Sequence, residues 1–187
     1  KPEHIAVILD GNRRWALERS LNPWMGHKEG AKKVEDLLDW CLEVGVKSIT
    51  LYAFSTENFR RPRKEVEELM RIFEEKLKKL LTDKRIYENK VKVKVIGKKS
   101  LLPKSLVKLI EEVEEATRNY DEHFLNIAIA YGGRAEIVDA ARKIAEKVER
   151  RELDPKQIDE KLFEKFLYTS HLPKQDPDLI IRTSGEE

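Results

Sequence analysis

The chain alternates between two kinds of hydrophobic pattern. Short apolar runs rich in Val, Ile and Leu predict buried β-strands. These runs cover residues 5–9, 49–54, 91–96, 125–130 and 179–181. Between them, apolar residues recur at three- and four-residue spacing, which gives a helix one apolar stripe. The helical patterns cover residues 34–41, 66–80, 106–113 and 137–148.

This alternation predicts an α/β fold. Strands that are apolar on both faces fit a mostly parallel central sheet flanked by helices on both faces. Gly45 is placed to end the first long helix, and Pro62 lies just ahead of the next one. We expect residues 150–177 to form short helical turns and loop, and residues 1–187 to form a single domain.

Composition excludes several classes of function. The 37 Lys and Arg nearly balance the 35 Asp and Glu, so nothing indicates a nucleic-acid partner. The single Cys41 cannot form an intrachain disulfide or a Cys-based zinc site, which favours a reducing, cytoplasmic location. Without a long apolar run or signal peptide, we expect at most peripheral membrane contact. The glycine motifs match neither a Walker loop nor GxGxxG, and the histidines lack zinc-ligand spacing.

Polar clusters follow four of the predicted strands, where open parallel sheets bind their ligands. The clusters are residues 10–14, 55–61, 132–134 and 182–185. All four contain arginine, whose planar fork suits phosphate oxygens, and three contain glycine, which permits close backbone approach. The lone carboxylate of Asp10 among arginines suggests Mg²⁺ bridging to a diphosphate.

Each of these features also has a simpler explanation. Asp10 is a suitable helix N-cap, and any single arginine could be a solvated surface cation. His27 stands at the start of a long helix, where His27, Lys28 and free backbone N–H groups could hold a second phosphate. It could equally be an ordinary capping-region histidine. The apolar stripes of the first two long helices suit the wall of a dry tunnel, but core packing explains them as well.

Five segments, in order, resemble the cis-prenyltransferase family, which makes undecaprenyl, dehydrodolichyl and related polyprenyl diphosphates. They are HIAVILDGNRRWA, GHKEGAK, LYAFSTENFRRP, NIAIAYGGRAEI and DLIIRTSGE. The match covers essentially the whole chain. The double arginine in DGNRR and the phrase AFSTENF resemble the archaeal and eukaryotic branch.

The resemblance implies condensation of isopentenyl diphosphate with an allylic diphosphate, farnesyl or geranylgeranyl, in cis geometry. Pyrophosphate leaves with the help of Mg²⁺, and a hydrophobic tunnel holds the growing chain. Two catalytic positions are implied: Asp10, which engages Mg²⁺, and Asn58, which assists proton removal. The implied substrate-binding positions are Gly11, Asn12, Arg13, Arg14, Trp15, His27, Ser55, Thr56, Glu57, Phe59, Arg61 and Arg182.

The chain departs from the family pattern in two places. Pro23 replaces an arginine that contacts phosphate in the family. The sequence also ends at Glu187, before further family residues that include a glutamate serving a dimer partner's magnesium site. We therefore expect a sequence truncated at its C-terminus, from a protein that forms a homodimer.

Two other functions fit part of the sequence. A non-catalytic partner subunit of a heteromeric synthase is the first, but such subunits tend to lose the residues that Asp10 and Asn58 match. A generic phosphate-ligand binding α/β domain is the second, and it explains the arginines without explaining five ordered motifs.

Overall fold

The computed structural model describes residues 1–183 and contains a five-stranded, wholly parallel sheet in the order β3-β4-β2-β1-β5. The strands are β1 (His4–Ile8), β2 (Ser48–Ser55), β3 (Val91–Ile96), β4 (His123–Tyr131) and β5 (Leu179–Arg182). Every predicted strand is present, and the predicted α/β fold with a parallel sheet is confirmed. The carboxyl ends of all five strands therefore lie along one edge.

Seven α-helices connect the strands in the described part of the chain. They are α1 (Asn12–Glu18), α2 (Pro23–Val44), α3 (Arg63–Leu80), α4 (Lys84–Glu88), α5 (Lys104–Ala116), α6 (Gly133–Glu149) and α7 (Glu160–Glu164). Short 3-10 helices occur at η1 (Thr56–Arg60), η2 (Lys99–Leu101) and η3 (Pro155–Gln157). As predicted, Gly45 ends α2 in a left-handed conformation with φ of 74°, and Pro62 directly precedes α3.

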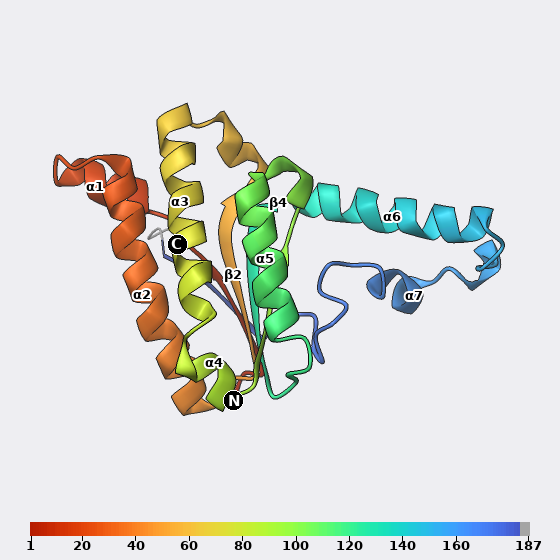
Figure 1. Ribbon diagram of the computed structural model, residues 1–187. Coiled ribbons are helices and arrows are strands. Elements are labelled where there is room, and N and C mark those ends of the chain that lie inside the picture. The colour runs from red at the N-terminus through yellow and green to blue at the C-terminus, as the bar shows by residue number, and fades with distance from the viewer. Residues whose placement is uncertain (184–187) are drawn as a thin grey trace.

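The two faces of the sheet differ. Figure 1 shows α2, α3, α4 and α5 gathered on one side, while α6 projects away on the other. The first side holds the hydrophobic core, in which strand residues such as Leu51 and Val93 pack with Leu106 of α5. On the opposite side β3 presents lysines in alternation with its buried valines. The segment after α7 covers part of that side, where His171 Nε2 lies 2.6 Å from Asn126 Oδ1.

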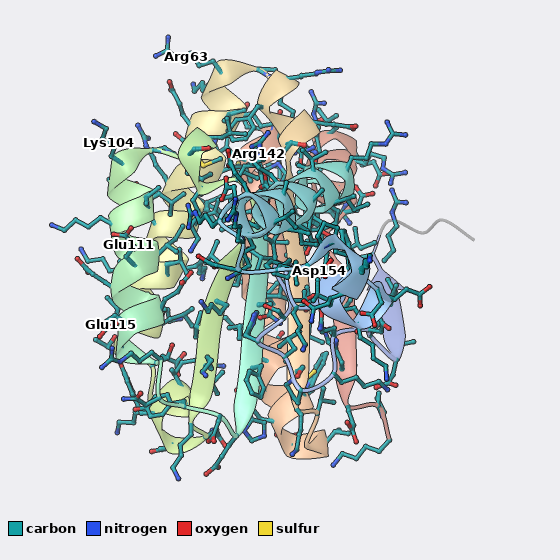
Figure 2. The ribbon with its side chains drawn as sticks, turned by 90° about the vertical axis from the view of Figure 1, so that its right-hand side faces the viewer. Arg63, Lys104, Glu111, Glu115, Arg142 and Asp154 are labelled. Atoms are coloured by element: carbon teal, nitrogen blue, oxygen red, sulfur yellow. The ribbon has the colours of Figure 1, made fainter. Side chains whose placement is uncertain are left out.

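The high charge of the sequence lies largely on outward faces. Figure 2 shows Arg63, Lys104, Glu111 and Glu115 pointing away from the body of the protein, and all four are exposed. Such solvated charges need no ligand to explain them. Within residues 1–183, none of the helices has the length and apolar character to cross a membrane.

Candidate active site

Asp10 follows β1 at the carboxyl edge of the sheet. Gly11 adopts a left-handed conformation with φ of 84°, which turns the chain from the strand into α1. Asp10 Oδ1 accepts from the Gly11 amide at 2.7 Å, and Oδ2 accepts from Arg182 Nη2 at 2.8 Å. Arg182 reaches it because β5 pairs with β1. The guanidinium lowers the pKa of Asp10, so this carboxylate is ionised near neutral pH.

Asp10 is not the N-cap of α1. Gly11 occupies the N-cap position, and no side chain caps the helix there. The capping interpretation of Asp10 is therefore wrong. Its carboxylate is instead turned toward the end of β5 and Arg182.

Two glycines of α2 allow α1 to approach closely. A Cβ at Gly26 would lie 1.9 Å from the backbone oxygen of Asn12, and one at Gly30 would lie 2.5 Å from Asn12 Nδ2. A larger residue at Gly26 would push the start of α1 away from α2, whereas one at Gly30 would require the Asn12 side chain to move. Glycine here fixes the loop beside His27, which lies between the two glycines in sequence.

The expected phosphate site at the backbone amides around His27 and Lys28 is wrong. Helix α2 begins at Pro23, so His27 is the fifth helical residue and its N–H belongs to the helix interior. His27 instead contributes its imidazole, which is only 10% exposed and has Nε2 3.2 Å from Glu65 Oε1. Burial lowers the pKa of His27, and the hydrogen bond to Glu65 opposes that shift in part.

Glu65 is a site residue that sequence reasoning missed. Its carboxylate is 3% exposed in the first turn of α3 and lies 3.3 Å from Arg61 Nη1 and 3.6 Å from Arg13 Nε. Together with His27, these groups surround one buried acid with nitrogen donors from three elements. The spacing of four residues between Arg61 and Glu65 could have indicated that these two side chains pair. Nothing in the sequence showed that Arg13 and His27 converge there too.

The segment after β2 divides its predicted residues between different environments. Asn58 caps η1 by accepting from the Ser55 amide at 2.9 Å, and its side chain also lines the cavity described below. Thr56 packs beside Gly132, where an added Cβ would lie 3.0 Å from Thr56 Oγ1. Phe59 is half-buried and packs against the core, with its ring centroid 4.9 Å from that of Phe54.

A cavity between α2, α3 and the sheet begins at this cluster. It contains about 1200 Å³ of atom-free space, including the part open to solvent. We call it the main cavity. The predicted site residues that line it are Asp10, Gly11, Asn12, Arg13, His27, Asn58 and Arg61. Those that do not line it are Arg14, Trp15, Ser55, Thr56, Glu57, Phe59 and Arg182.

Beyond this polar mouth the walls of the main cavity are mostly apolar. They include Val34 and Leu38 of α2, Leu69 and Phe73 of α3, and Ile127 of β4. Residues of both long apolar stripes thus line a cavity as well as packing in the core. An ionic contact between the two helices forms part of the cavity wall.

That contact is made by Glu35 of α2 with two lysines of α3. Glu35 lies 2.8 Å from Lys76 Nζ and 2.9 Å from Lys79 Nζ. The hydrogen bonds from these lysines, led by Lys76, lower the pKa of Glu35 and keep the acid ionised. The contact therefore tethers α2 to α3 along the length of the cavity.

Fold and site together define a class of protein. A cationic rim at the carboxyl edge of a parallel sheet suits an anionic head group, and a deep apolar cavity behind it suits a hydrocarbon tail. An α/β protein with this arrangement is suited to bind amphiphiles with anionic heads.

Comparison with known proteins narrows this class. Residues 8–187 match the Prenyltransf family, described as "Putative undecaprenyl diphosphate synthase". The chain belongs to this family. It is 53% identical to the tritrans,polycis-undecaprenyl-diphosphate synthase (geranylgeranyl-diphosphate specific) of Pyrococcus horikoshii, over 99% of this chain and 69% of that protein. The same identity holds for the like-named enzyme of Methanocaldococcus jannaschii, over 100% of this chain and 66% of that protein.

A solved structure agrees in fold. Lavandulyl diphosphate synthase from Lavandula x intermedia, in complex with dimethylallyl diphosphate, superposes with a TM-score of 0.93 at 38% identity. The alignment covers 100% of this chain and 79% of that one. The expectation of a cis-prenyltransferase, and of an enzyme rather than a partner subunit, is confirmed, as is the resemblance to archaeal members.

Proposed function

We propose that the protein condenses isopentenyl diphosphate with geranylgeranyl diphosphate in cis geometry and so builds a long-chain polyprenyl diphosphate. The observation that carries this proposal is the main cavity, whose cationic mouth gives way to apolar walls. The names of the archaeal relatives favour geranylgeranyl over farnesyl diphosphate as the allylic substrate.

The allylic diphosphate is held at the mouth by Arg13, His27 and Arg61, with Gly11 and Asn12 beside it. These groups are fixed in advance through Glu65, so they are oriented before charge develops on the departing pyrophosphate. Electrostatic stabilisation of this kind acts most strongly where water is excluded. The apolar walls behind the mouth provide that exclusion.

Asp10 fits a role in holding Mg²⁺. Within residues 1–183, no group of three or more His, Cys, Asp or Glu side chains is placed to enclose a metal. Mg²⁺ needs no such cage, because it commonly binds through one or two carboxylates together with substrate phosphates. Asp10 supplies one ionised carboxylate beside cationic groups that attract a diphosphate. When bound, Mg²⁺ supplies positive charge to the leaving pyrophosphate.

Isopentenyl diphosphate binds on the β5 side of Asp10, with Arg182 as its diphosphate ligand. The 2.8 Å contact between Arg182 and Asp10 supports this, because it sets the two substrate heads side by side. Arg14 and Trp15 of α1 and Ser55, Thr56 and Glu57 after β2 are further proposed substrate-binding residues, outside the lining of the main cavity.

Asn58 assists removal of the proton that the new chain loses after condensation. The Ser55 amide holds the Asn58 side-chain oxygen in place. Phe59 contributes by packing beneath this segment.

The test is incubation of the protein with geranylgeranyl diphosphate, labelled isopentenyl diphosphate and Mg²⁺, followed by lipid extraction. We expect labelled long-chain product, and none after Mg²⁺ is chelated. Absence of labelled lipid with either geranylgeranyl or farnesyl diphosphate would contradict the proposal.

We further propose that the protein is a cytoplasmic homodimer, with loose membrane contact where its lipid product leaves. Two exposed apolar surfaces support a dimer: β5, an edge strand whose Ile180 is 60% exposed, and α6, whose Ile137 is 55% exposed. Exposed apolar edge strands are liable to pair with another chain. Light scattering should give twice the monomer mass, and Ile137→Lys should lower it toward the monomer.

A further inference from the structure

Strand β5, which carries Arg182, has little packing of its own. It lies at the edge of the sheet, and in the described part of the chain it pairs with β1 alone. All four of its residues are exposed, among them Ile180 at 60% and Ile181 at 38%. Burial of apolar side chains therefore does little to fix where this strand lies. Its position depends on its pairing with β1 and on the segment that leads into it.

That segment, residues 165–178 between α7 and β5, crosses the face of the sheet opposite the main cavity (Figure 2). We call it the strap. Its first part is held by α6, where the Tyr168 amide donates to Glu136 Oε1 at 2.8 Å. At its other end, Asp178 Oδ2 accepts from the His4 amide at 3.1 Å, and the Asp178 amide donates to the His4 carbonyl at 2.8 Å.

Between these ends the strap is attached to the sheet by a chain of hydrogen bonds. His171 Nε2 lies 2.6 Å from Asn126 Oδ1, and the imidazole is the donor because an amide oxygen only accepts. Asn126 Nδ2 in turn donates to Thr50 Oγ1 at 3.2 Å. The Thr50 hydroxyl can then donate its own proton to His4 Nε2, which lies 2.8 Å away. We call these four side chains the relay.

The relay is buried where it crosses the sheet. Asn126 is fully buried and His4 is 2% exposed, so water cannot readily replace a lost partner at either residue. Thr50 and Asn126 are partners in the register of β2 and β4, which sets their side chains next to each other on one face. Loss of one bond would leave a buried donor or acceptor unsatisfied, so the relay resists displacement of the strap.

His4 joins the relay to the start of β5. Its ring is the last member of the relay, and its backbone holds Asp178, which directly precedes Leu179. Arg182 follows Asp178 by only four positions, and its guanidinium lies 2.8 Å from Asp10 Oδ2. A shift of the strap is therefore passed to Arg182 through a short strand that few other contacts restrain.

We propose that His171 and Asn126 are positioning residues for the binding of isopentenyl diphosphate. Through the relay they hold the strap in the place from which β5 sets Arg182 beside Asp10. This inference rests on the proposed function, in which Arg182 is the diphosphate ligand. None of the four relay residues lines the main cavity, so loss of the relay should weaken the binding of isopentenyl diphosphate far more than that of the allylic substrate.

The experiment measures steady-state kinetics for both substrates with the full chain and its His171→Leu variant. This substitution removes the donor to Asn126 and keeps a side chain of similar bulk on the sheet. We expect KM for isopentenyl diphosphate to rise about fivefold, as loss of one hydrogen bond would give, whereas kcat and KM for geranylgeranyl diphosphate should change much less. His171→Gln retains an N–H donor at the end of its side chain, so it should restore most of the binding.

Thr117→Val is the matched control. Thr117 is also buried, and its hydroxyl accepts from the Val93 amide at 3.0 Å and donates to the Val113 carbonyl at 3.0 Å. It lies at the end of α5 beside β3, the edge strand farthest from β5. The control should lower Tm and leave both KM values unchanged, which separates lost stability from lost positioning.

A double-mutant cycle shows whether His171 acts through Arg182. Arg182→Ala alone should raise KM for isopentenyl diphosphate by a larger factor than His171→Leu does. In the Arg182→Ala background His171→Leu should add little, because the group that it positions is already gone. Effects that multiply independently, or equal rises in KM for both substrates, would overturn the inference.

Failure of the inference is distinct from failure of the proposed function. If the unmodified protein forms no prenyl product, the proposed function fails and the inference falls with it. If the protein is active and a folded His171→Leu variant keeps the original KM for isopentenyl diphosphate, only the positioning role is overturned. Should His171→Leu not fold, Thr50→Val breaks the relay within β2 with little change of shape, and an unchanged KM in that variant overturns the role equally.

Discussion

Glu65 offers a sharp test of how the mouth of the main cavity is organised. Substitution Glu65→Gln keeps the shape of the side chain and removes its charge from contact with His27, Arg61 and Arg13. Loss of one partner from a buried ion pair costs about 3–5 kcal/mol. The Arg13 and Arg61 side chains are 47% and 28% exposed, so solvent screens part of this, and we expect about 2 kcal/mol.

At this size of protein, about 2 kcal/mol corresponds to a fall in Tm of roughly 4–8 °C. Because the diphosphate-binding cations lose their shared anchor, KM for the allylic diphosphate should rise about tenfold, equivalent to about 1.4 kcal/mol. The Michaelis constant for isopentenyl diphosphate should change less. Steady-state kinetics and a thermal melt measure these effects.

A matched control shows whether the effect depends on where the carboxylate lies or only on the loss of one negative charge from α3. Glu67→Gln on the same helix removes a carboxylate paired at 2.8 Å with Arg63, whose side chain is 93% exposed, so it should change Tm and KM little. If Glu65→Gln instead lowered KM, the acid would merely oppose anion binding. The positioning role would then be refuted.

Three further predictions concern Asp10, the packing of α1 on α2, and a buried histidine on the other face of the sheet. Asp10→Ala should lower turnover by on the order of a hundredfold with a smaller effect on substrate binding, measured by single-turnover kinetics; near-normal turnover would contradict its role. Gly26→Ala should destabilise the protein by about 1–3 kcal/mol in urea unfolding, because its Cβ would meet the Asn12 backbone, whereas Gly133→Ala, with open space around it, should not. Burial lowers the pKa of His171 from 6.5 to about 4, so the unfolded state binds the proton first as pH falls through this window. Stability should therefore drop by about 1–2 kcal/mol between pH 7.5 and 5, after discounting for partial exposure, and His171→Gln should lose less; equal losses would exclude His171 as the cause.

The strands were predictable because their apolar runs are compact and separated by clear helical patterns. The strand predicted at residues 91–96 has the same bounds as β3 in the structure. Gly45 and Pro62 marked the end of α2 and the start of α3 through their backbone preferences. The start of α2 was not predicted, because Pro23 was considered only as a lost arginine and not as a first helical residue. Helix α4, five residues long, is too short to show a periodic stripe.

The sequence indicated which segments form the site, but not how the side chains within those segments are oriented. Asp10 and Asn58 follow strands, and parallel strands end at one edge, so their approach followed from topology. Phe59 and Trp15 were expected to bind substrate because they stand in the same motifs as Asn58 and Asp10. In the structure Phe59 packs inward on Phe54, and Trp15 is 37% exposed. Such orientations depend on tertiary packing that local spacing does not encode.

Convergence on a single buried acid was the least predictable feature. Glu65 gathers groups from α1, α2 and the segment before α3, which are separated by up to 52 positions along the chain between Arg13 and Glu65. A pattern within one helix reports only the contact with Arg61. The contact with Arg13 also depends on the close approach of α1 to α2 at Gly26, and His27 reaches Glu65 from α2.

The most direct test of the central claim is a crystal structure with geranylgeranyl thiodiphosphate, a poorly reactive analogue of the allylic substrate, and Mg²⁺. The account predicts the diphosphate between Asp10, Arg13 and His27, with the hydrocarbon tail in the main cavity between α2 and α3. A diphosphate bound away from the carboxyl edge of the sheet, or a tail outside the main cavity, would contradict it.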